Sequence, residues 1–155
     1  MLHTTYANKF LELITAKKNS ISGTGKCYIG FSSTTPTAAG SNFTEPSGGG
    51  YKRIQLAIAS ALDYTDKMGE PSGGVISNKS AFSSEQCTAE GGWPEFTHFG
   101  IFDGNDSKSF LIASDVLRDP DGTPDSDGLF PQTTMKVAHK QVAVFKVDSL
   151  QLTLK

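Results

Sequence analysis

The sequence predicts a mainly β protein, an antiparallel and jelly-roll-like β-sandwich of about eight to ten short strands with one N-terminal α-helix. Three observations lead to this fold class. Beyond residue 25, apolar residues recur with the two-residue period of strands, glycine and proline turn signals separate the runs, and no strand–helix–strand alternation is present. The 155 residues are the length of one domain. We therefore expect a helix over residues 1–20 and a single β-sandwich domain over residues 21–155.

Residues 1–20 have the pattern of an amphipathic helix. Tyr6, Phe10, Leu13 and Ile14 recur at steps of three and four residues, and Leu11 widens this apolar stripe. A helix of about fourteen residues is marginal by itself in water. Its apolar face therefore needs a partner, which is either the core of the same domain or another subunit.

The strands are predicted from short apolar runs that are alternating or continuous. The segment 93–103 is apolar on both faces, which predicts a central strand, and 110–117 is its expected hairpin partner across the turn at 104–109. The final segment, 150–155, alternates leucine with polar residues. The other predicted strands cover residues 26–31, 51–59, 75–78, 80–84, 134–140 and 142–149.

Two long polar loops interrupt this pattern. The first, residues 32–50, is nineteen residues long and ends in Gly48, Gly49 and Gly50. A loop of this length inside one domain is more often functional, or an arm, than idle. The three glycines are interpreted as a hinge before the strand at 51–59.

The second loop, residues 119–128, is acidic. It holds Asp119, Asp121, Asp125 and Asp127, and hard cations such as calcium bind carboxylates at short loop spacing. The spacing does not fit the EF-hand pattern, because Gly122 stands at the fourth position rather than the sixth. A solvated turn is the favoured interpretation.

Composition and charge exclude several classes of partner. Fourteen basic and 16 acidic residues give a net charge of -2, unlike a strongly basic nucleic-acid-binding protein. No run approaches the roughly 20 apolar residues of a membrane span. Residues 1–62 carry six basic and two acidic residues, whereas residues 63–155 carry eight and fourteen. This asymmetry is either a chance distribution over a solvated surface or suits a component that docks with its neighbours electrostatically.

No motif for catalysis, a cofactor or a metal stands out. The G-x-S-x-G elbow of serine hydrolases is absent, and Cys27, Cys87, His98 and His139 lack the tight spacing of zinc ligands. We therefore predict no catalytic, cofactor-binding or metal-binding residues.

The N-terminal apolar run is interrupted by charges and does not resemble a signal peptide. Synthesis in a cytoplasm follows, and two reduced thiols are favoured over one disulfide.

Three segments carry a resemblance to a known family. They are EPSGGGYKR (residues 45–53), NKSAF (residues 78–82) and WPEFTHFGIFD (residues 93–103). In these segments, and in their order along the chain, the protein resembles small tailed-bacteriophage virion proteins of the phage tail fibre protein group.

The resemblance implies a non-enzymatic structural component of a phage or phage-like particle, assembled in the host bacterial cytoplasm and built into the virion. Its place in the tail, baseplate, neck or fibre stays open, as does its copy number. Its partners would be other virion proteins and copies of itself. The contacts are expected at Tyr6, Phe10, Leu13, Ile14, Glu45, Gly48, Gly49, Gly50, Tyr51 and Arg53.

Two alternatives remain at this point. One is a decoration protein of the capsid surface. The other is a tip module that binds a receptor or a host surface glycan, with Trp93 and Tyr51 stacking on sugar rings.

Overall fold

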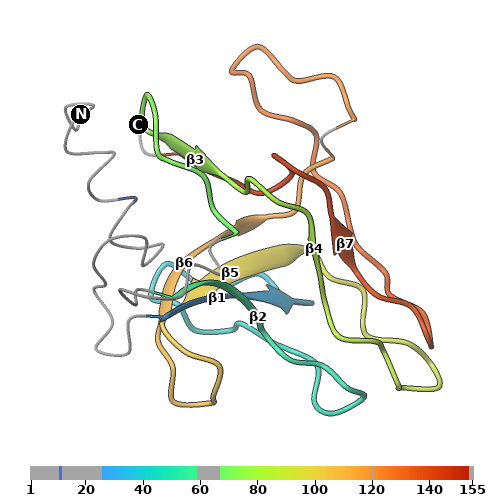
Figure 1. Cartoon of the computed structure of the whole chain (residues 1–155). Coiled ribbons are helices and arrows are strands. Elements are labelled where there is room, and N and C mark those ends of the chain that lie inside the picture. Colours follow the sequence, from blue (N-terminus) through green and yellow to red (C-terminus); the bar gives the residue numbers. More distant parts are fainter. Residues whose placement is uncertain (1–10, 12–25, 59–66, 120, 154–155) are drawn as a thin grey trace.

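The computed structural model describes residues 11, 26–58, 67–119 and 121–153 (Figure 1). Within these residues the chain is mainly β, as predicted, and its strands are antiparallel. The strands are β1 (Lys26–Ser32), β2 (Ile54–Ile58), β3 (Val75–Ser77), β4 (Phe82–Ser83), β5 (His98–Phe102), β6 (Leu111–Val116), β7 (Val144–Phe145) and β8 (Gln151–Thr153).

The largest sheet has four strands in the order β2-β1-β5-β6. Its centre is the antiparallel pair of β1 and β5, in which Gly30 faces Gly100 and Ile29 faces Ile101. Strand β5 is central and its consecutive residues 100–102 are all buried, so the predicted two-sided burial is confirmed. The predicted hairpin of β5 and β6 is confirmed as well.

Two further sheets have two strands each, and both join distant parts of the chain. Strand β3 pairs with β8, with Ile76 opposite Leu152. Strand β4 pairs with β7, with Phe82 opposite Phe145. The structure thus shows one four-stranded and two two-stranded sheets in the part of the chain that it describes, and a complete sandwich remains a prediction.

Several predicted strands are shorter than expected. Residues 134–140 form no strand; Met135 makes a single bridge to Phe96 there. The physical reason is a turn that follows, in which Lys140 has a φ of 65° and Gln141 N–H bonds to the carbonyl of Ala138. This left-handed conformation ends the extended backbone, so β7 begins only at residue 144.

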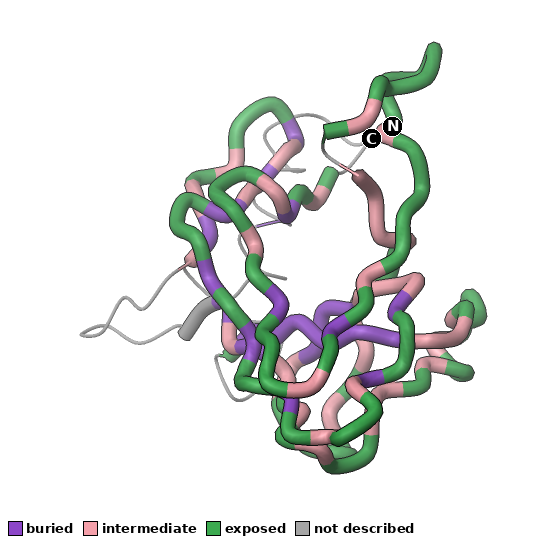
Figure 2. The backbone as a smooth tube through the Cα atoms, turned by 90° about the vertical axis from the view of Figure 1, so that its right-hand side faces the viewer, coloured by how far each residue is buried: buried purple, intermediate pink, exposed green. Residues whose placement is uncertain are grey.

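The core links the large sheet to the β4–β7 pair through aromatic rings. The Phe31 ring of β1 stacks on Phe145 with centroids 5.3 Å apart, and Phe145 stacks on Phe82 at 4.8 Å. Phe31 also meets Phe96 in a tilted arrangement, with centroids 5.6 Å apart. Figure 2 shows the buried residues gathered toward the inside of the fold, with most exposed residues on the projecting loops.

Leu11 is the single described residue of the predicted N-terminal helix. Its side chain is fully buried and belongs to the same core cluster. The N-terminal segment therefore contributes to the core of this chain at that position. The helix itself, with Tyr6, Phe10, Leu13 and Ile14, lies outside the described residues. Among the described residues, no helix has the length and apolar character needed to cross a bilayer.

Candidate functional site

The loop after β1 folds back on itself. Ser33 N–H donates to the carbonyl of Thr44 (3.1 Å), and the Ser32 hydroxyl accepts from Thr44 N–H (2.9 Å). Near the tip, the Asn42 side-chain amide donates to the carbonyl of Thr35 (2.8 Å). These bonds join the two ends of the loop, so it has a defined shape over the sheet instead of extending as an arm.

The glycine run at the end of this loop is a packed turn and not a free hinge. Gly48, Gly49 and Gly50 all have a positive φ, between 61° and 78°. The carbonyl of Gly49 accepts from the Trp93 indole N–H and from Thr88 N–H, both at 2.9 Å. The glycines are needed here because the backbone turns through left-handed conformations directly against residues 86–93.

Glu45 and Arg53 form a largely buried ion pair across this turn. Arg53 Nη2 lies 2.6 Å from Glu45 Oε2, and the side chains are only 10% and 20% exposed. Arg53 Nε donates to both carboxylate oxygens. Its Nη1 donates to the carbonyls of Gly104 (3.0 Å) and Asp106 (3.1 Å) in the β5–β6 turn. Arg53 therefore connects the 32–50 loop to the β5–β6 hairpin.

The guanidinium of Arg53 also stacks on an aromatic ring. Its central carbon lies 3.4 Å from the ring centroid of Phe102, which is cation–π geometry. A glycine makes this close arrangement feasible, because a Cβ at Gly30 would stand 2.5 Å from Glu45 Oε1. The ion pair of Glu45 and Arg53 thus packs directly against β1.

Tyr51 completes the ion-pair site. Its hydroxyl donates to Glu45 Oε1 and accepts from Phe31 N–H, both at 2.8 Å. Burial, followed by the negative charge of Glu45, raises the pKa of the Tyr51 hydroxyl above its ordinary value. The hydroxyl therefore keeps its proton and acts as a donor to the carboxylate.

The two aromatic residues considered for stacking on sugars pack on the core. Trp93 is 4% exposed, and its indole N–H is bonded to Gly49. Tyr51 packs edge-on against it, with ring centroids 5.4 Å apart and an interplanar angle of 87°. The Trp93 ring is therefore buried, whereas the Tyr51 ring is partly buried and packs against the core.

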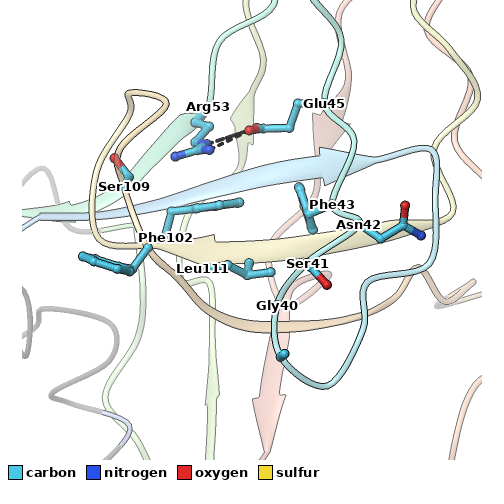
Figure 3. Close-up of a pocket in the computed structure, with 11 residues that line it drawn as sticks. Gly40, Ser41, Asn42, Phe43, Glu45, Arg53, Phe102, Ser109 and Leu111 are labelled. Carbon is cyan, nitrogen blue, oxygen red and sulfur yellow. Dashed lines mark hydrogen bonds and ion pairs between the residues drawn. The ribbon is translucent and has the colours of Figure 1, made fainter.

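A groove lies beside the ion pair, between the 32–50 loop and the β5–β6 hairpin (Figure 3). Its volume is about 380 Å³. Phe43 and Phe102 meet edge to face in its wall, with centroids 5.1 Å apart. Gly100 permits this packing, because a Cβ there would lie 2.5 Å from Leu111 Cδ1 and 2.6 Å from Phe43 Cε2.

The rim of the groove mixes one apolar ring with polar side chains. Phe110 is 76% exposed and lines the groove together with Ser41, Asn42 and Ser109. The sequence pattern missed Phe110, because it reads as the first apolar residue of a strand. The chain reaches β6 only at Leu111, and Phe110 N–H is bonded to the Asp103 carboxylate in the preceding turn.

The aspartates of the acidic loop make the hydrogen bonds that are usual in turns. The Asp119 carboxylate accepts from Asp121 N–H, and the Asp125 carboxylate accepts from the N–H groups of Asp127 and Leu129. Such bonds are typical of aspartates that stabilise a turn, which agrees with the favoured interpretation.

The histidines and cysteines considered as metal ligands have other surroundings. His98 Nδ1 is bonded to the Thr97 hydroxyl and His139 Nδ1 to the carbonyl of Ala89. Cys27 and Cys87 are both buried, and neither is in a disulfide. In the described part of the chain, no three His, Cys, Asp or Glu side chains lie close enough together to hold a metal ion.

Of the residues predicted to make contacts, the structure therefore brings Glu45, Tyr51 and Arg53 together and places the glycine run beside them. Comparison with curated proteins finds no match to this chain. A family model described as podophage GP4 fiber I protein gp80 matches residues 1–145, which is nearly the whole chain. The chain belongs to this podophage fibre family, as its resemblance to phage tail fibre proteins indicated, and is a structural component of a virion.

Proposed function

We propose that this protein is a non-enzymatic, fibre-associated subunit that acts through contacts with other virion proteins and with copies of itself. It is assembled in the host bacterial cytoplasm and takes its place at the tail, baseplate or neck of the particle. Residues 21–155 form its single β domain, and the predicted helix face of Tyr6, Phe10, Leu13 and Ile14 anchors it.

One observation carries this proposal. In the segment that resembles phage fibre proteins, Tyr51 and Arg53 hold the Glu45 carboxylate. Tyr51 also accepts a hydrogen bond from β1, and Arg53 donates to the β5–β6 turn. A carboxylate held by a guanidinium and a tyrosine hydroxyl is well suited to fixing loop geometry and poorly suited to reacting with a substrate. The segment therefore builds a surface of defined shape, and the outer face of the 32–50 loop supplies contacts on that surface.

The anchor role is tested by deleting residues 1–10, which leaves the buried Leu11 in place. We expect a folded protein with an unchanged unfolding midpoint and a complete loss of incorporation into particles. Circular dichroism and the protein content of purified particles measure the two effects. A longer deletion of residues 1–18 is the less informative variant, because it also removes Leu11, at a cost of about 2–5 kcal/mol in stability. Normal incorporation of the shorter deletion would refute the anchor.

A second candidate function has one observation in its favour. The exposed Phe110 ring lines the groove together with the polar side chains of Asn42 and Ser109, which is the composition of a site for a host surface glycan or receptor. In this alternative, the protein is a tip module in which the groove replaces Trp93 and Tyr51 as the binding element.

Changing Phe110 to alanine tests this alternative. Because the ring is exposed, we expect stability to change by no more than about 0.5 kcal/mol. If the groove binds a glycan, saturable adsorption of the purified protein to host cells falls at least tenfold in the variant. Asn105→Ala, an exposed change in the same turn that does not line the groove, is the control. Absence of saturable cell binding by the unchanged protein would remove this candidate.

A further inference from the structure

The groove beside the ion pair offers no free charge to a ligand. Among the described residues that line it, Glu45 and Arg53 are the charged ones, and each neutralises the other. The Nε–H of Arg53, both of its Nη1–H groups and one Nη2–H are bonded within the chain, which leaves one N–H. A bidentate hold on a carboxylate or phosphate needs two such N–H groups. The groove therefore disfavours an anionic ligand.

A cationic ligand is disfavoured in the same way. Both oxygens of the Glu45 carboxylate accept hydrogen bonds from Arg53, and Oε1 also accepts from the Tyr51 hydroxyl. The carboxylate has its counter-charge already, and its side chain is only 20% exposed. Because a charge removed from water without a partner is costly, the ligand that suits this groove is uncharged.

Phe110 supplies an apolar ring at this groove. It is 76% exposed, and its backbone N–H is held by the Asp103 carboxylate at 2.7 Å. An exposed aromatic ring of this kind can cover the C–H groups on one face of a sugar ring, because stacking removes apolar area of both partners from water. The ring therefore provides the apolar part of a carbohydrate site.

The polar part comes from side chains with unused hydrogen-bonding capacity. The Asn42 amide donates one N–H to the carbonyl of Thr35, which leaves its second N–H and its oxygen without a partner among the described residues. The Ser109 hydroxyl donates to the Asp106 carboxylate and accepts from Asp106 N–H, so it keeps one lone pair. A sugar hydroxyl both donates and accepts, and it thus matches an amide that can do both.

The arrangement of these groups sets the length of the ligand. Figure 3 shows Asn42 and Ser109 at opposite ends of the groove, the first on the 32–50 loop and the second in the β5–β6 turn next to Phe110 in the chain. A ligand that contacts both ends is therefore longer than one sugar ring. The groove volume of about 380 Å³ is near the lower end of ligand sites, which span roughly 300–1,000 Å³, so the ligand is short.

We propose that the groove binds a short, uncharged oligosaccharide, with one sugar ring on Phe110 and hydroxyl groups bonded to the Asn42 amide. The inference rests on the second candidate function and names the class of glycan that the groove accepts. Acidic and phosphorylated sugars are poor ligands, because the one guanidinium at the groove is neutralised by Glu45.

Binding of the full-length protein to matched saccharides tests the proposal. The probes are the neutral trimers maltotriose, cellotriose and chitotriose, the acidic trimer trigalacturonic acid, and glucose as a single ring. We expect saturable binding of at least one neutral trimer in a calorimetric titration, weaker binding of glucose and none of the acidic trimer. Phe110→Ala and Asn42→Asp should each weaken the trimer by about tenfold or more. Aspartate tolerates the φ of 63° at this position but cannot donate.

Two exposed changes in the β5–β6 turn are the controls. Asn105 and Lys108 do not line the groove, so Asn105→Ala and Lys108→Ala should bind the trimer as the unchanged protein does. Circular dichroism of all four variants shows that each is folded. The Lys108→Ala control also tests the charge argument, because it removes the basic side chain of this turn.

Three results would overturn the inference. They are binding of the acidic trimer in place of the neutral ones, neutral binding that survives both Phe110→Ala and Asn42→Asp, and failure of every neutral trimer to bind a protein that adsorbs to host cells. The last result leaves the tip-module function standing with another ligand class. Conversely, a neutral trimer bound through Phe110 and Asn42, without saturable adsorption to host cells, supports the groove assignment and rejects the tip module.

Discussion

Replacing Arg53 by alanine should lower the free energy of unfolding by about 3–5 kcal/mol, because it leaves the Glu45 carboxylate without its partner in a largely buried site. The same change removes the donor to the carbonyls of Gly104 and Asp106 and the cation that lies over Phe102. Urea denaturation followed by circular dichroism measures the loss.

The neighbouring Lys52 offers a matched control for this prediction. Its side chain is exposed, so Lys52→Ala should change stability by no more than about 0.5 kcal/mol. In the double variant Glu45→Ala/Arg53→Ala, the total loss should be smaller than the sum of the two single losses, because no lone charge remains. An Arg53→Ala protein as stable as the Lys52→Ala control would show that the ion pair does not hold the loop.

Replacing Gly50 by alanine should lower stability by about 2–4 kcal/mol, combining a strained left-handed conformation with overpacking. Gly50 has a φ of 78°, and a Cβ there would stand 2.6 Å from the carbonyl oxygen of Gln86. Since the contacting atom belongs to the backbone, it cannot move aside by a side-chain rotation. Thermal unfolding gives the difference from the unchanged protein.

The variant Gly48→Ala separates the cost of the left-handed conformation from the cost of overpacking. The φ of Gly48 is 77°, nearly the same, but a Cβ there would have no neighbour within 4 Å. Gly48→Ala should therefore show only the conformational cost, about 1 kcal/mol. Equal losses in the two variants would mean that the glycine turn does not pack against residues 86–93 as the structure shows.

Local pattern was enough to predict the β5–β6 hairpin. Its two apolar runs are separated by the short polar turn at 104–109, so the partners are neighbours along the chain. The pairings of β3 with β8 and β4 with β7 could not be predicted in this way. Ile76 and Leu152 are far apart in sequence, and a strand of two or three residues carries no local signal of its partner.

The candidate site was predicted in part. The glycines and charged residues between Glu45 and Arg53 stand out in the sequence, but their interpretation as a hinge and a contact surface did not foresee the internal bonds of Tyr51 and Arg53. Those bonds depend on Phe31 and the β5–β6 turn, which only folding brings near. Phe110 was missed for a similar reason, because the register of β6 decides that its ring stays outside.

The sequence by itself determined the β class, the buried central strand and the membership in a phage fibre group, because these follow from alternation, apolar runs and local motifs. Tertiary structure alone decided which side chains are covered. Trp93 and Val144 are both apolar residues among short strands, yet the first is 4% and the second 65% exposed. The physical reason is that burial depends on what packs over a residue. For Trp93 that is the glycine turn, whereas among the described residues nothing covers Val144.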